Sequence, residues 1–324
     1  MADPISSTIV GAIAGPVFEQ LWKAGGGVAQ HIKDQPKKID AINQLHAASA
    51  EYEQRFRDRH GQIKVMPGLM KDPVSLDSIY TAVKLLDNRD IRHFRTEQDL
   101  EDVYRQAGRR SFQLGSDKRI DGMAIANQKQ YLMVLGGPGI GKSTFLRKLG
   151  IEALKQGGQF KRECIPVLIE LKTLRQSKVD LFEVIAAEFE TCGFPAAEGF
   201  AAKVLQQGRL LVLLDGLDEV PKRNLNNVTG CIEDFVDRYD KNCFVASCRV
   251  AAYDSSFRRF TDVTISEFDD EQIRQFINRW FNSKLDQEDE TAEQYWQLLS
   301  QPENQGGKGA GADAAAADVP LLGI

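Results

Sequence analysis

The chain has 324 residues, of which 42% are hydrophobic and 27% are charged, as is ordinary for a globular protein of about two domains. Its 41 basic and 46 acidic residues give a net charge of −5, which argues against nucleic acid as a partner. No apolar run approaches the roughly 20 residues of a membrane-spanning helix. The five cysteines form no CxxC pair and lie mostly in apolar segments, which indicates reduced core residues in a cytoplasmic protein.

The first 61 residues are predicted to form a small all-α region. Residues 5–34 have the composition of an apolar helix, and apolar residues at helical spacing predict an amphipathic helix over 39–60. One interpretation is a helical bundle or oligomerisation module. The alternative is a segment that acts on a membrane or on a protein partner, centred on residues 1–34. The apolar segment lacks the basic polar face of membrane-surface helices, which favours the bundle.

Residues 62–110 are predicted to be a linker that leads into the main domain. Two prolines and a glycine in 62–80 indicate irregular chain with short extended pieces. A helix is predicted around 96–111.

From Tyr131 onward, short apolar runs alternate with amphipathic helices. The runs occupy 131–136, 164–171, 209–215, 242–249 and 262–265. The helices are expected near 142–155, 180–191 and 225–239. Continuous apolar strands separated by helices predict an α/β domain over 111–266, with a parallel sheet covered on both faces. Such sheets bind ligands at the carboxyl ends of their strands.

The stretch "GGPGIGKST" lies between a predicted strand and a predicted helix and fits the pattern GxxxxGK[ST]. Glycines let successive backbone N–H groups point inward, and the following helix offers its positive end to a phosphate. Lys142 is expected to reach the β- and γ-phosphates of a nucleotide, and the hydroxyl of Ser143 to bind Mg²⁺. The predicted nucleotide-binding residues are Gly136, Gly137, Pro138, Gly139, Ile140, Gly141, Lys142, Ser143 and Thr144.

A second motif, "LVLLDGLDEV", places three carboxylates after a buried strand. Asp215 ends the strand and is predicted to hold the Mg²⁺ that it shares with Ser143. Either Glu219 or Asp218 is a candidate general base for the attacking water. The alternative for these two acids is a solvated helix start or a salt bridge.

A third strand, "CFVASCRV", ends in Arg249. An arginine at this position could contact the γ-phosphate and so report its presence, because a guanidinium suits charge-assisted recognition of phosphate. The alternative is an ion pair with Asp218 or Glu219.

With these three motifs in this order, the chain resembles the NACHT family of P-loop NTPases, over roughly residues 110–300. A small residue after the metal-binding Asp215, followed by two further acids, is similar to the NACHT form of this motif. Residues 71–86 resemble, more weakly, the segment that precedes many such domains. The stretch "FTDVTISEFDDEQIRQFINRWF" resembles the strand and first helix that follow the arginine strand, so 267–308 are expected to begin a helical subdomain.

The resemblance implies a P-loop NTPase of the signal-transduction (STAND) class that binds ATP or ADP with Mg²⁺. It implies a switch that is closed with ADP and forms a homo-oligomer when an unknown trigger ligand and ATP exchange coincide. Hydrolysis would be slow and would reset the switch. The implied role is antiphage defence in bacteria, or innate immunity and cell death in animals.

The end of the chain departs from the family pattern. Family members continue into a winged-helix region and a sensing region, whereas this chain stops at Ile324. Residues 309–324 are of low complexity and resemble no helix of the family. One hypothesis is that this tail is a frameshift product.

Two other function classes remain as alternatives. In one, the N-terminal helices are an effector or adaptor whose output is contact with a protein or membrane, and the P-loop domain only regulates them. In the other, the chain is a P-loop kinase or transport ATPase. The lack of an LSGGQ-like stretch counts against a transport ATPase, and the lack of an obvious arginine-rich lid counts against a kinase.

Overall fold

A computed structural model describes residues 36–63, 73–87, 119–175, 179–194, 196–253, 257–282, 287 and 290–300, with the side chains of 36–46 and 87 not included. The predictions for residues 1–34, for a helix at 96–111 and for the tail 309–324 lie outside the described residues.

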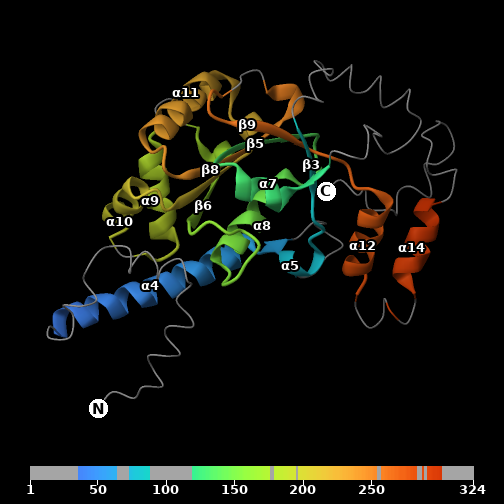
Figure 1. Cartoon of the computed structure of the whole chain (residues 1–324), viewed down its shortest axis with the longest axis horizontal. Helices are drawn as coiled ribbons and strands as arrows, with labels where there is room; N and C mark the ends of the chain where they lie inside the picture. The colour runs from blue at the N-terminus through green and yellow to red at the C-terminus, as the bar shows by residue number, and fades with distance from the viewer. Residues whose placement is uncertain are drawn as a thin grey trace, which may run out of the picture.

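A seven-stranded sheet forms the centre of the described chain (Figure 1). Its strands in spatial order are β4 (Ile120–Asp121), β3 (Lys84–Asp87), β9 (Thr261–Ile265), β5 (Tyr131–Gly136), β8 (Cys243–Arg249), β7 (Leu210–Asp215) and β6 (Ile165–Glu170). The last five are parallel, whereas β3 runs antiparallel to both β9 and β4. The predicted parallel sheet is therefore confirmed, with each strand boundary within one residue of its expected position.

The antiparallel edge of the sheet was not predicted. Strand β3 lies in the segment that was expected to be linker, and it pairs Leu85 with Ile265, which is 180 positions away in the sequence. Because β3 is only four residues long, no apolar run marks it. Two further strands, β1 (Gln62–Ile63) and β2 (Val74–Ser75), form a small antiparallel ribbon and match the expected short extended pieces.

The helices differ in how clearly the sequence marks them. Those predicted in the sheet domain are α8 (Lys142–Leu154), α9 (Leu181–Thr191) and α11 (Lys222–Arg238). Those not predicted are α5 (Leu76–Ile79), α7 (Gly122–Gln128) and α10 (Ala197–Gln206). Helix α10 begins after Ala196, which has a positive φ and no side chain that caps the helix. The usual polar start signal is absent there, so the sequence pattern did not reveal this helix.

The sheet is covered on both faces. Every residue of β7 is buried, as are the first six of β8. Successive side chains of a strand point to opposite faces, so burial of all of them requires cover on each side. All five cysteines are free thiols, and only Cys231 is partly exposed, which confirms the expected core cysteines.

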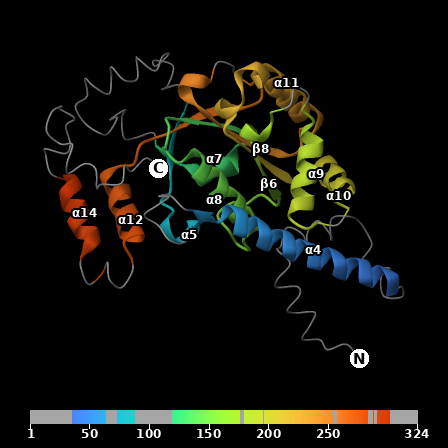
Figure 2. The same ribbon diagram turned by 180° about the vertical axis from the view of Figure 1, so that it is seen from behind.

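Helix α4 (Pro36–His60) confirms the predicted amphipathic helix and packs on the sheet domain (Figure 2). Its Tyr52 is fully buried and donates a hydrogen bond of 2.7 Å to the carbonyl oxygen of Pro166. Phe56, also fully buried, lies so close to Gly150 of α8 that a Cβ there would sit 2.7 Å from the ring. The C-terminal half of α4 therefore shares the core of the sheet domain.

Two helices follow the sheet, α12 (Asp270–Trp280) and α14 (Thr291–Ser300), and lie side by side (Figure 1). Asp269 and Gln272 form a capping box at the start of α12, which fixes where the helix begins. Among the described residues, we find no helix with the length and apolar character needed to cross a bilayer.

Candidate functional site

The three motifs meet at one edge of the sheet. Strands β5, β7 and β8 are neighbours in the order β5, β8, β7 and run parallel, so their carboxyl ends face the same side. Gly136, the last residue of β5, is directly opposite Arg249, the last residue of β8. Asp215 ends β7 beside them. The juxtaposition that the strand pattern predicted is thus present.

The loop from Gly136 to Gly141 turns the chain from β5 into α8. Gly141 has φ +97° and ψ 17°, a left-handed conformation that strains residues with a side chain, and it precedes the first residue of the helix. A Cβ at Gly137 would meet no atom within 4 Å, so the chain is open to solvent on that side of Gly137. This backbone suits a group with negative charge, because the N-terminus of α8 carries a partial positive charge.

Lys142 is folded over this loop. Its Nζ donates to the carbonyl oxygens of Gly136 and Gly137, at 3.1 and 2.7 Å. Burial lowers the pKa of Lys142, and Asp218 nearby partly offsets this effect. Among the described residues, only these backbone carbonyls hold the ammonium group, so it can exchange them for phosphate oxygens.

Ser143 and Asp215 lie close enough to serve one metal ion. The Ser143 hydroxyl donates a hydrogen bond of 3.0 Å to Oδ1 of Asp215. A hydroxyl and a carboxylate oxygen are the ligands that Mg²⁺ prefers, and it typically adds phosphate oxygens and water. No group of three or more His, Cys, Asp or Glu side chains that could hold a metal occurs in the described ranges. The Ser143 hydroxyl and the Asp215 carboxylate fit a Mg²⁺ whose other ligands come from a nucleotide and water.

Asp215 accepts a second hydrogen bond, which sequence reasoning missed. Ser247 of β8 donates to its Oδ1 at 2.6 Å, and the Ser247 oxygen accepts from the N–H of Gly216 at 2.8 Å. Ser247 is fully buried. The only feature of the sequence that could have revealed this contact is a serine within the apolar run "CFVASC". A buried hydroxyl in a strand usually bonds to the backbone, so this serine did not indicate a contact with Asp215.

Arg249 forms the ion pair that was one of its two predicted roles. Its Nε lies 2.9 Å from Oδ2 of Asp218, and its backbone N–H donates to Oδ1 of the same carboxylate at 2.9 Å. The Asp218 side chain is 7% exposed, whereas that of Arg249 is 51% exposed. One oxygen of the aspartate therefore pairs with a charge and the other accepts a backbone hydrogen bond. Contact between Arg249 and a γ-phosphate stays a prediction.

Glu219 has a different environment from Asp218. It is exposed, and its side chain makes no hydrogen bond or ion pair within the described part of the protein. Gly216 has φ +79°, and a Cβ there would come within 3.2 Å of the Glu219 carboxyl carbon. The turn therefore places the Glu219 carboxylate close to Gly216, the residue that follows Asp215.

An apolar pocket lies beside the phosphate loop. The loop and α8 contribute Ile140, Gly141 and Thr144 to its wall. The segment around α5 contributes Ile79, Tyr80, Thr81 and Val83, and the chain around α12 contributes Phe268 and Phe276. The hydroxyl of Thr81 is buried and has no hydrogen-bond partner among the described residues. The pocket is small and its wall is mainly apolar.

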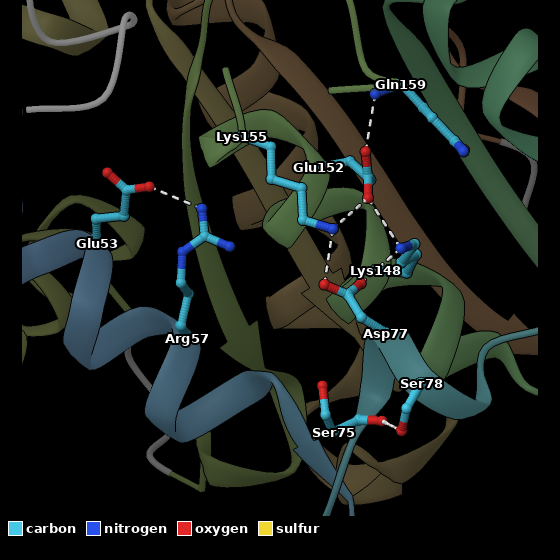
Figure 3. A network of polar contacts seen from close by, with 9 residues as sticks. All are labelled: Glu53, Arg57, Ser75, Asp77, Ser78, Lys148, Glu152, Lys155 and Gln159. Atoms are coloured by element: carbon cyan, nitrogen blue, oxygen red, sulfur yellow. Dashed lines mark hydrogen bonds and ion pairs between the residues drawn. The ribbon is translucent and has the colours of Figure 1, made fainter. Parts of the chain in front are cut away.

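A partly buried network of charges holds the α5 segment against α8 (Figure 3). Lys148 contacts Asp77 at 2.6 Å and Glu152 at 2.8 Å, and Lys155 contacts the same two carboxylates at 2.7 and 2.8 Å. The backbone N–H of Gln159 donates to Glu152 at 2.8 Å. Because α8 starts at the phosphate loop, the network fixes one wall of the pocket relative to that loop.

The network predicts a loss of stability in acid. Burial raises the pKa of Glu152, but hydrogen bonds from Gln159, Lys148 and Lys155 outweigh this effect and lower the pKa from 4.5 to about 2. The stabilisation is therefore complete above pH 4.5 and is lost as the pH falls towards 2. Urea unfolding of wild type should show the free energy of unfolding falling over this window, and Glu152→Gln should show a flatter profile. Parallel profiles for the two proteins would contradict the role of Glu152.

A known family matches the part of the chain that contains this site. Residues 130–284 match the sequence model of the NACHT domain. A search of curated proteins found no match. Similar solved structures include a Signal Transduction ATPase with Numerous Domains (STAND) protein with a tetratricopeptide repeat sensor from Pyrococcus horikoshii, at 11% identity and a TM-score of 0.31, covering 56% of this chain and 27% of that one.

Two further structures are similar over about half of the chain. A RuvB variant from Thermotoga maritima has 14% identity and a TM-score of 0.27, and the match covers 58% of this chain and 53% of RuvB. PCH-2 from C. elegans has 12% identity and a TM-score of 0.30, with 48% and 41% covered. The chain thus matches only part of the length of each of these proteins. The family assignment comes from the sequence model, and residues 130–284 of this chain form a NACHT domain of the P-loop NTPase class.

Proposed function

We propose that the protein is an ATP-binding switch, in which a slow Mg²⁺-dependent hydrolysis controls the assembly of a homo-oligomer. The observation that carries the proposal is the 3.0 Å hydrogen bond from Ser143 to Asp215, directly after the glycine-rich loop. This bond joins a phosphate cradle to a metal-binding carboxylate, as nucleotide binding with Mg²⁺ requires. A role in antiphage defence, innate immunity or cell death is supported only by the family.

The nucleotide would bind with its phosphates in the loop 136–141 and its base in the adjacent apolar pocket. The N–H groups of the loop and the ammonium of Lys142 would hold the phosphates. The apolar wall of this pocket would contact the faces of the base. Three segments that are distant in the sequence line this pocket, so nucleotide binding would bring the α5 segment, the loop and α12 together.

Hydrolysis would use the carboxylates at the end of β7. A Mg²⁺ held by Ser143, Asp215 and the phosphates would neutralise charge that develops on the leaving phosphate oxygens. Glu219 is the better candidate for general base, because its carboxylate is exposed and unpaired among the described residues. Both oxygens of Asp218 are engaged by Arg249, one by its guanidinium and one by its backbone N–H, so they are less available to an attacking water.

The nucleotide that co-purifies with the full chain tests the proposal directly. We expect stoichiometric ADP, released by denaturation and identified by chromatography, because a slow switch rests in its diphosphate state. A preparation that contains no nucleotide and binds neither ATP nor ADP in titration would contradict the proposal. Rapid phosphoryl transfer to a small acceptor would instead indicate a kinase.

A further inference from the structure

The buried serine at the centre of β8 stands out because it contacts the proposed metal-binding carboxylate directly. Ser247 donates to Oδ1 of Asp215 at 2.6 Å, which is shorter than the 3.0 Å bond from Ser143 to the same oxygen. We propose that Ser247 is a positioning residue, which orients the Asp215 carboxylate for the Mg²⁺ of a bound nucleotide. This inference rests on the proposed nucleotide-binding function.

The two hydroxyls that contact Asp215 differ in what else they do. Ser143 is an exposed residue of the first turn of α8, directly after the phosphate loop, and is itself expected to bind the metal. Ser247 is 0% exposed and lies in a strand paired with β5 on one side and β7 on the other. Its position is thus set by the sheet rather than by the ligand. Of the two donors, only Ser247 can hold Asp215 independently of the state of the phosphate loop.

The direction of the hydrogen bonds leaves one carboxylate oxygen available. Both hydroxyls donate to Oδ1, and in the described part of the chain no side-chain hydrogen bond falls on Oδ2. A carboxylate held through one oxygen can rotate little about its χ2 bond, so Oδ2 keeps a constant direction. A Mg²⁺ ion demands near-ideal octahedral geometry. The affinity of the site for Mg²⁺ therefore depends on how the carboxylate is oriented, whether it binds the ion directly or through one of the ion's water molecules.

Ser247 also holds the turn that follows Asp215. Its oxygen accepts the N–H of Gly216 at 2.8 Å, and the carbonyl of Gly216 accepts the N–H of Glu219 at 3.0 Å. One hydroxyl therefore connects Asp215, the left-handed turn at Gly216 and the short helix that carries Asp218 and Glu219. Loss of this hydroxyl would remove a donor from a carboxylate and leave a buried N–H unpaired.

The test measures how Mg²⁺ tightens the binding of a fluorescent, non-hydrolysable ATP analogue to the full chain. In Ser247→Ala, the Mg²⁺ concentration that gives half of the tightening should rise about tenfold, as expected for loss of one hydrogen bond to a charged group. Affinity in EDTA should stay within about twofold of wild type, since the loop and Lys142 are unchanged. Ser247→Thr, which keeps a hydroxyl, should restore the wild-type Mg²⁺ dependence.

Two further variants keep the test decisive. Ser247→Cys preserves the side-chain size with a weak donor and should behave like Ser247→Ala, even if the alanine variant unfolds. Ser49→Ala removes another fully buried serine hydroxyl, from α4, and should leave the Mg²⁺ dependence unchanged. Thermal unfolding without nucleotide shows which variants are folded.

The outcomes separate this inference from the proposed function. Ser247→Ala and Ser247→Cys with wild-type Mg²⁺ dependence, or with affinity lost equally in EDTA and in Mg²⁺, would overturn the positioning role alone. Wild-type protein that binds the analogue with no response to Mg²⁺ would do the same. Wild-type protein that fails to bind the analogue at all would overturn the proposed function and this inference with it.

Discussion

Lys142→Ala is expected to lose nucleotide binding. The Lys142 ammonium now rests on the carbonyl oxygens of Gly136 and Gly137, which are weaker acceptors than phosphate oxygens. Lys142 carries the only positive charge in the stretch 136–144. The substitution therefore removes two or more charge-assisted hydrogen bonds that this ammonium would make to the phosphates. At roughly 1.5–3 kcal/mol for each bond, affinity for ATP should fall at least about 100-fold. Isothermal titration calorimetry with ATP and Mg²⁺ measures this loss.

A matched control shows that the effect depends on position rather than on charge. Lys161 is an exposed lysine whose Nζ donates to the carbonyl of Gly158, in the chain between α8 and β6. Lys161→Ala removes the same charge from the protein but lies at the other end of α8 from the loop. Its affinity should stay within about threefold of wild type, as for most surface substitutions. Equal affinity in Lys142→Ala and wild type would end the interpretation of this loop as a phosphate cradle.

Glu219→Gln is expected to separate binding from hydrolysis. Glutamine keeps the size of the side chain but cannot accept a proton, whereas the Lys142, Ser143 and Asp215 contacts are untouched. Loss of a general base typically lowers a rate by about 10²–10⁴-fold. Single-turnover hydrolysis of radiolabelled ATP should slow by at least about 100-fold, while the affinity for ATP stays near that of wild type.

Comparison with Asp218→Asn shows which of the two acids is the general base. Asparagine breaks the ion pair with Arg249 but leaves Glu219 in place. If Glu219 is the base, Asp218→Asn should retain a larger share of the hydrolysis rate than Glu219→Gln does. The reverse ranking would assign the base to Asp218 and leave Glu219 as a solvated acid. A glutamine variant with the wild-type rate would exclude Glu219.

The parallel core of the fold could be predicted because its signals are local. Each of the five parallel strands is an apolar run between turn residues, and each predicted helix of the domain has its own apolar stripe. The phosphate loop and the Asp215 strand end carry their chemistry in consecutive residues. The short antiparallel strands and α10 could not be predicted in this way. Their placement depends on partners such as Ile265 for Leu85, which no local pattern specifies.

The sequence by itself determined the residue types of the candidate site and their order along β5, β7 and β8. It did so because the glycine-rich loop, Lys142, Ser143 and Asp215 form contiguous motifs at predicted strand ends. The tertiary structure alone decided which acid pairs with Arg249, that Ser247 reaches Asp215, and that the α5 segment completes the pocket. These contacts form across strands and between segments far apart in the chain. Side-chain distances across a sheet depend on strand order and register, and neither is written in any one stretch of residues.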